Sequence, residues 1–215
     1  MSVDSANRGA GFPNRISRIL LLAVRDVLGE NGSSAVLTTA KLAQYAATLP
    51  AADFEPGLIF SEVGRFFEAL ESIYGVQAGD RLSKQIGRES FKYWIEGFGG
   101  LVSLADVLLR FLPLSLRVRI GVEVVSEIIN RYTDQRLVLG ESRDQYLVTL
   151  ETCGLCVGRR TDIAACGYMN GTLDELLFWV SRGRRFAIQE TACVAMGDPA
   201  CVFAIDKVPQ SSAGA

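Results

Sequence analysis

The stretch ETACVAMGDPACVFAI, residues 190–205, combines two cysteines, a turn signal and two apolar runs. The Gly-Asp-Pro sequence at 197–199 favours a turn, and the residues on both sides have the apolar and β-branched character of strands. We therefore expect a hairpin in which Cys193 ends one strand and Cys201 begins the next. Their sulfur atoms can then approach each other, and Glu190 lies three residues before the first of them.

Strand-like and helix-like patterns occupy different parts of the chain, which predicts an α+β fold with N-terminal helices packed on a small antiparallel sheet. The last third is expected to run β-β-α-β-β with two hairpins. Strands are predicted at 135–139, 145–151, 185–193 and 200–206, and helices at 15–29, 34–48, 60–74, 80–95, 101–112, 116–132 and 161–181. The predicted organisation is a disordered tail at 1–14, one domain at 15–206 (helical part 15–133, strand-rich part 134–206) and a flexible tail at 207–215.

Composition narrows the classes of function. Of the 215 residues 49% are hydrophobic and 21% charged, which is sufficient for a sizeable core, and the net charge of −2 argues against a nucleic-acid partner. The arginines at 182, 184 and 185 are read as solvated surface.

Membrane and export signals are weak. The most apolar stretch, 97–116, contains Asp106 and Arg110, so it predicts a buried helix or a peripheral membrane contact, and no transmembrane span is expected. Without a signal peptide we expect a cytoplasmic protein with reduced cysteines.

All five cysteines lie between residues 153 and 201, a clustering that a core alone does not need. Three thiolates and one carboxylate can form a closed tetrahedral zinc site without histidine. Cys166, at the start of the crossing helix, is expected to join the hairpin residues there. The pair Cys153 and Cys156 can instead supply a sulfur in place of the carboxylate. Buried structural thiols and a redox pair remain alternatives to a metal.

No catalytic constellation is visible in the chain, which contains no histidine. It has no dinucleotide fingerprint, no phosphate loop, no paired carboxylates and no serine or cysteine beside an evident base. Whether it is an enzyme stays open, and the residues favour a protein that is not one.

Aromatic residues at helical spacing favour ordinary core packing. A ligand pocket is the alternative interpretation, because such sites are concave and mostly apolar. The predicted pocket residues are Phe91, Trp94, Phe98, Tyr132 and Trp179.

The segment CGYMNG at 166–171, the helix after it and IQETACVAMGDPACVFAI together resemble the C-terminal half of the vinyl-4-reductase domain family. The helical stretch FFEALESIYGVQAGDRLSKQIGRESF is similar to its paired helices, so the resemblance spans 15–206. That family includes bacteriochlorophyll-biosynthesis accessory proteins and sensory domains of phenol-responsive activators. It is related in fold to transport-protein-particle subunits and to haem domains that bind nitric oxide.

The resemblance implies a structural zinc ion held by Cys166, Glu190, Cys193 and Cys201, the positions that match the phenol sensors' ligands. Cys153 and Cys156 lie outside that set and remain alternates. The missing histidine departs from the relatives, so we expect no haem bound through histidine and no phenol contact of that type. The reductase activity in the family name is not carried over.

The leading hypothesis is a cytoplasmic, homodimeric domain that binds a small hydrophobic ligand between helices and sheet. Zinc would fix the hairpin, and a separate signalling or pathway protein would act on the signal. One alternative is an accessory protein or enzyme of tetrapyrrole (bacteriochlorophyll) biosynthesis. The other is an interaction scaffold like the transport-particle subunits.

Overall fold

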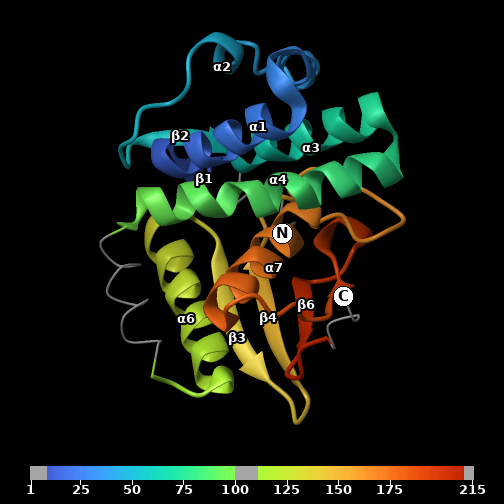
Figure 1. Ribbon diagram of the computed structural model, residues 1–215. Helices are drawn as coiled ribbons and strands as arrows, with labels where there is room; N and C mark the ends of the chain where they lie inside the picture. Colours follow the sequence, from blue (N-terminus) through green and yellow to red (C-terminus); the bar gives the residue numbers. More distant parts are fainter. Residues whose placement is uncertain (1–8, 100–110, 211–215) are drawn as a thin grey trace, which may run out of the picture.

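Helices and antiparallel strands form separate layers in the computed structural model, which describes residues 9–99 and 111–210 (Figure 1). The fold is therefore α+β, as the sequence predicts. In chain order the elements are β1 (Gly11–Pro13), α1 (Asn14–Thr39), α2 (Gln44–Ala47), β2 (Pro56–Ile59), α3 (Phe60–Tyr74), α4 (Val76–Gly97), α6 (Leu114–Tyr132), β3 (Arg136–Glu141), β4 (Gln145–Thr152), α7 (Gly167–Ser181), β5 (Ile188–Ala192), a short 3-10 helix (Val194–Met196) and β6 (Cys201–Asp206).

The C-terminal sheet has the order β3-β4-β6-β5, and every neighbouring pair is antiparallel. The two predicted hairpins are thus confirmed, with α7 connecting them. Alternate residues of β4 point into the core, and Leu150 is paired with Cys201 at the first residue of β6. Helices α6 and α7 lie against one face of this sheet, and α4 separates them from α1 and α3 (Figure 1).

Helices α4 and α7 pack with their backbones in contact, and two glycines permit it. A Cβ atom at Gly87 would overlap the carbonyl oxygen of Tyr168, and one at Gly171 would overlap the carbonyl oxygen of Lys84. Because the obstacles are backbone atoms of a neighbouring helix, they cannot rotate away as a side chain can. The two glycines therefore set the distance between α4 and α7.

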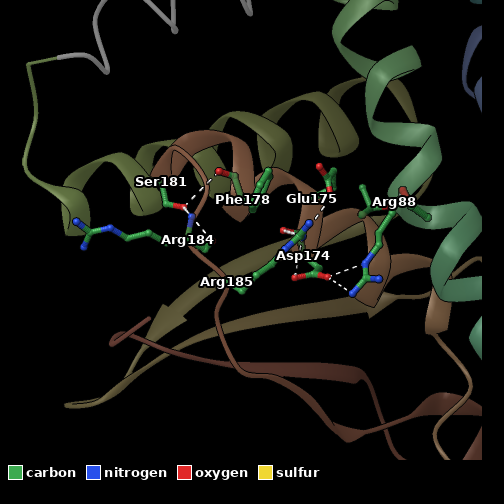
Figure 2. Close-up of polar contacts among 9 residues, drawn as sticks. Arg88, Asp174, Glu175, Phe178, Ser181, Arg184 and Arg185 are labelled. Atoms are coloured by element: carbon green, nitrogen blue, oxygen red, sulfur yellow. Dashed lines mark hydrogen bonds and ion pairs between the residues drawn. The ribbon is translucent and has the colours of Figure 1, made fainter. Parts of the chain in front are cut away.

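An ion-pair network joins the same two helices (Figure 2). The buried carboxylate of Asp174 on α7 accepts a hydrogen bond of 2.7 Å from Arg88 Nε on α4 and forms an ion pair of 3.3 Å with Arg185. Arg185 also contacts Glu175 at 3.1 Å and stacks 3.9 Å from the Phe178 ring centroid. Arg185 therefore joins α7 to the chain entering β5 while its side chain stays 39% exposed, and Arg182 and Arg184 are exposed, as the interpretation of this cluster as surface expects.

We expect Asp174→Asn to lower the free energy of unfolding by about 2 kcal/mol, because two arginines lose a buried anionic acceptor. For a chain of this length that is roughly 4–8 °C in Tm, measured by thermal denaturation. Glu175→Gln is the matched control, since it removes one half-exposed contact and should cost less than about 1 kcal/mol. Equal losses from the two variants would contradict the role assigned to Asp174.

The N-terminal part is not purely helical, which corrects the prediction of a disordered tail to residue 14 and of an entirely helical part at 15–133. Strand β1 pairs antiparallel with β2, with Gly11 opposite Ile59. Strands of three and four residues are too short to show a period of two in the sequence. Their pairing depends on contacts more than forty residues apart.

Other helix and tail boundaries also differ from those predicted from the sequence. Helix α1 continues to Thr39 through a kink at Gly29 (φ 67°), and the next helix is only α2, because the chain reverses at Lys41 (φ 61°). Helix α7 begins at Gly167 instead of 161. Residues 207–210 are held by backbone hydrogen bonds, such as that from Gln210 N to Arg185 O, so the flexible tail does not begin at 207.

The predicted helix at 101–112 and most of the stretch considered for peripheral membrane contact lie outside the described residues. Within residues 9–99 and 111–210, no helix is both long enough and apolar enough to cross a bilayer.

Candidate functional site

Four separate segments bring the five cysteines together in the core. Cys153 and Cys156 lie in the turn after β4, and Cys166 is the residue that precedes α7. Cys193 directly follows β5, and Cys201 opens β6, as the hairpin prediction requires. All five are buried and none forms a disulfide.

Their sulfur atoms are in mutual contact. Cys156 Sγ lies 3.1 Å from Cys166 Sγ and 3.7 Å from those of Cys193 and Cys201. Cys166 Sγ is also 3.5 Å from both Cys153 Sγ and Cys201 Sγ. Hydrogen bonds from Cys153 and Cys166 lower the pKa of Cys156, and the same thiol contacts raise the pKa of Cys166.

Glu190 on β5 adds a carboxylate to this cluster. Its Oε2 accepts a hydrogen bond of 3.0 Å from the backbone N–H of Cys166, and its Oε1 is buried without a hydrogen-bond partner among the described residues. Burial, and then the neighbouring Cys193 sulfur, raise the pKa of Glu190 to about 8. A buried carboxylate oxygen without a partner is costly, and a bound cation would relieve that cost.

The donor atoms fit a tetrahedral divalent ion. Cys166, Glu190, Cys193 and Cys201 offer four ligand atoms that all lie within 4.8 Å of one another, and so do Cys153, Cys156, Cys166 and Cys201. Thiolate with carboxylate is a ligand chemistry of zinc, and four protein ligands leave no open position. The structure thus assembles both the set implied by the family resemblance and the alternates. Metal binding itself stays a prediction.

Backbone contacts hold the hairpin end in place. Asp198 Oδ2 accepts a hydrogen bond of 2.7 Å from Cys193 N, and Val194 N donates to Cys201 Sγ over 3.3 Å. An N–H group directed at sulfur stabilises a thiolate, in the way that outer contacts orient metal ligands. Gly197 supplies the positive φ of 102° that closes this turn.

Arg159 fixes the segment between Cys156 and Cys166, a role that sequence reasoning missed. Its side chain is only 1% exposed and forms an ion pair with Glu71 on α3. It also donates to the carbonyl oxygens of Leu155 (3.2 Å) and Ala165 (3.0 Å). No local pattern marks it, because its ion-pair partner Glu71 lies 88 residues away in the sequence.

A cavity of about 80 Å³ lies between α4, α6 and α7, and its lining is almost entirely apolar. Four of the five predicted pocket residues line it: Phe91, Trp94, Phe98 and Trp179. Tyr132 does not line this cavity. Its ring stacks on that of Phe54, with centroids 4.6 Å apart.

Two polar donors in the lining have no hydrogen-bond partner among the described residues. They are the indole Nε1 of Trp94 and the amide Nε2 of Gln135, and both atoms are buried. The phenol of Tyr168 also lines the cavity, and burial raises its pKa, so it stays protonated. Both unpartnered donor atoms are covered by neighbouring groups, so a ligand acceptor would reach them only if part of the wall moves.

The cavity and the cysteine cluster share two chain segments. Leu155, between the first two cysteines, lines the cavity, and so do Tyr168 and Met169, which directly follow Cys166-Gly167. The cluster and the cavity wall are therefore connected through the backbone at Leu155 and at Tyr168.

The fold places the chain in a class of α+β domains in which helices enclose an apolar space above an antiparallel sheet. The solved structures that it resembles are H-NOX proteins. A variant of Tt H-NOX superposes with a TM-score of 0.58 at 12% identity, covering 94% of this chain and 99% of that one. The K. algicida protein in its Fe(II) unliganded state gives 0.57 at 13% identity (94% and 98%). The S. oneidensis protein in the Fe(II)NO state gives 0.54 at 13% (91% and 99%).

At these identities the likeness establishes the fold. No family model matches the chain, and no curated protein matches it by sequence. The nitric-oxide-sensor-like fold expected from the sequence is thereby confirmed.

The expectation of no haem bound through histidine is contradicted by the same comparison. H-NOX neighbours are haem-binding domains, and two of those compared were solved with Fe(II). That expectation rested on the absence of histidine, but cysteine, methionine and tyrosine also ligate haem iron.

Proposed function

We propose that this chain is a sensory domain that binds a small, largely apolar molecule in the cavity between α4, α6 and α7. The observation that carries the proposal is the apolar cavity with two unpartnered donors, Trp94 Nε1 and Gln135 Nε2. Ligand sites are mostly apolar with a few polar groups that fix orientation, and this cavity has that character.

The volume limits the ligand. An engineered cavity of about 150 Å³ accepts benzene, so the 80 Å³ here suits a compact molecule, or one for which the walls yield slightly. The donors favour a ligand that carries an acceptor atom. A polar group without a partner in such a site costs about 1–3 kcal/mol, and a ligand acceptor recovers it.

We assign the metal a structural role in this sensor. A zinc ion held by Cys166, Glu190, Cys193 and Cys201 would have no free coordination position, so it would perform no chemistry. Because Tyr168 and Met169 directly follow the first ligand, the ion would fix the wall of the cavity. This assignment agrees with the resemblance to the vinyl-4-reductase domain family, which is itself a proposal.

A sensor of this kind acts through a second protein or a second copy of this chain. Ligand binding would alter the packing of α4 on α7, and a partner that contacts either helix would respond. The resemblance favours a homodimer with a separate signalling protein.

Tryptophan fluorescence tests the ligand site directly, because the two tryptophans of the chain both line the cavity. We expect saturable changes with phenol and benzene, and phenol should bind about tenfold more tightly, since one hydrogen bond contributes about 1.4 kcal/mol. Trp94→Phe should remove that preference in calorimetric titrations while leaving benzene binding within about twofold.

A pair of valine-to-phenylalanine variants provides a further test of the site and its control. Val124→Phe adds a ring at the cavity wall and should abolish binding of both probes. Val138→Phe makes the same change on the exposed side of β3, where it should have no effect. Binding that survives Val124→Phe unchanged would place the probes elsewhere and refute the proposed site.

A further inference from the structure

We propose that the cysteine cluster binds two divalent ions of the zinc type, which share Cys166 and Cys201 as bridging thiolates. One ion would be completed by Cys153 and Cys156, and the other by Glu190 and Cys193. This inference rests on the proposed zinc site and extends it to a second ion, in which all five cysteines take part.

The geometry that points to two ions is the overlap of the two four-donor sets. Each set lies within 4.8 Å, and Cys166 and Cys201 are the members they have in common. Two tetrahedra that share an edge need six donors, which is the number present here. With Zn–S bonds of about 2.3 Å, a tetrahedral edge is about 3.8 Å, and the two shared sulfurs are 3.5 Å apart.

The two outer pairs come from different segments, and they must separate when both ions bind, because Cys156 Sγ lies 3.7 Å from Cys193 Sγ whereas terminal ligands of edge-sharing tetrahedra are about 5 Å apart. Cys153 and Cys156 belong to the turn after β4, where the N–H of Cys156 donates to the carbonyl of Cys153 over 3.2 Å. Glu190 and Cys193 belong to the end of β5. A Cys-x2-Cys turn is a common way to present two thiolates to one zinc ion.

Net charge and hydrogen bonding are both compatible with two bound ions. Two divalent ions against five thiolates and one carboxylate leave the same net charge as one ion against three thiolates and one carboxylate. The second ion therefore adds no net charge to the core, since it releases the protons of Cys153 and Cys156. Coordination also gives Glu190 Oε1 the partner it lacks.

A route for the ions exists. A polar cleft of about 650 Å³ is lined by Cys153 and Cys156, and also by Arg159, Arg160 and Asp162. Ions can thus reach the cluster from solvent without unfolding of the sheet. Access of this kind is one requirement for a working metal site.

The rival arrangement is a single ion bound by Cys156, Cys166, Cys193 and Cys201, since Cys156 Sγ lies 3.7 Å from Cys193 Sγ as well. That arrangement leaves the Cys153 thiol and the Glu190 carboxylate without a metal. The two arrangements differ in the number of ions bound at saturation, which can be counted.

The test is metal counting on the full chain under reducing conditions, by native mass spectrometry and elemental analysis after titration with zinc. We expect two ions per chain. The double variants Cys153→Ser/Cys156→Ser and Glu190→Gln/Cys193→Ser should each retain one ion, and Cys166→Ser should lose both. Loading the unmodified chain with cadmium-113 should give two NMR signals, coupled through the shared sulfurs, which tests the proposal even where a variant does not fold.

One ion at saturation, with a single cadmium signal, would overturn the second site and leave the structural zinc of the proposed function in place. No tightly bound ion would overturn both. Iron together with acid-labile sulfide would also overturn the proposal, because an iron–sulfur cluster would then occupy the thiolates.

Discussion

Removal of metal from the chain is expected to lower Tm by roughly 8–16 °C. An ion present at a thousand times its Kd stabilises the folded state by about 4 kcal/mol, and each kcal/mol corresponds to about 2–4 °C for a chain of this length. The physical reason is that the ion cross-links three segments whose thiols meet in the core. These are the turn after β4, the start of α7 and the β5–β6 hairpin. Differential scanning calorimetry in zinc and in chelator measures the difference.

Cys201→Ser isolates this contribution, because Cys201 belongs to both donor sets. The variant should melt at the same temperature in zinc and in chelator. Val202→Ser changes the neighbouring residue on the other side of β6, so it should keep the full zinc-dependent shift whatever its own cost. Identical melting of the unmodified chain in zinc and in chelator would show that the cluster is an ordinary buried group of thiols.

The hairpin cysteines could be predicted because their geometry is local. The turn at 197–199 brings Cys193 and Cys201 together whatever the rest of the fold does, and Glu190 is on the strand that leads into the turn. The spacing of Cys153 and Cys156 marked them as alternate ligands, but it could not predict that their sulfurs contact Cys166. That contact depends on the path of residues 153–166, which the contacts of Arg159 to Glu71 and to two carbonyl groups determine.

Sequence spacing likewise predicts only part of the cavity lining. Helical spacing correctly places Phe91 and Trp94 on one face of α4, Phe98 directly follows that helix, and α7 brings Trp179 to the same space. Spacing cannot say which face of α6 meets them. Tyr132, at the last turn of α6, points instead to Phe54, and Gln135 beyond that helix takes a place in the wall. The sequence also did not predict the pairing of β1 with β2. Each strand is too short to have a recognisable pattern and becomes a strand only through its pairing with the other.

Gly171→Ala is expected to lower the free energy of unfolding by about 3 kcal/mol or more. In an isolated helix this change would be favourable by up to about 1 kcal/mol, since alanine has the higher helix propensity. Here the new Cβ would occupy the space of the Lys84 carbonyl oxygen, a backbone atom of α4. The helices must then separate along their length, and overpacking of this kind costs about 1–3 kcal/mol, occasionally more. Chemical denaturation measures the loss.

Gly140→Ala is the matched control, because a Cβ there meets its nearest neighbours at 3.8 Å, an ordinary contact, and the site is exposed. It should change stability by less than about 1 kcal/mol. The two variants also differ in a functional readout. Separation of α4 from α7 moves Trp94 away from Tyr168 across the cavity, so Gly171→Ala should weaken phenol binding in the protein that still folds, whereas Gly140→Ala should not. Unchanged stability in Gly171→Ala would mean that α4 and α7 are less closely packed than their glycines indicate, and the cavity between them would then be wider than 80 Å³.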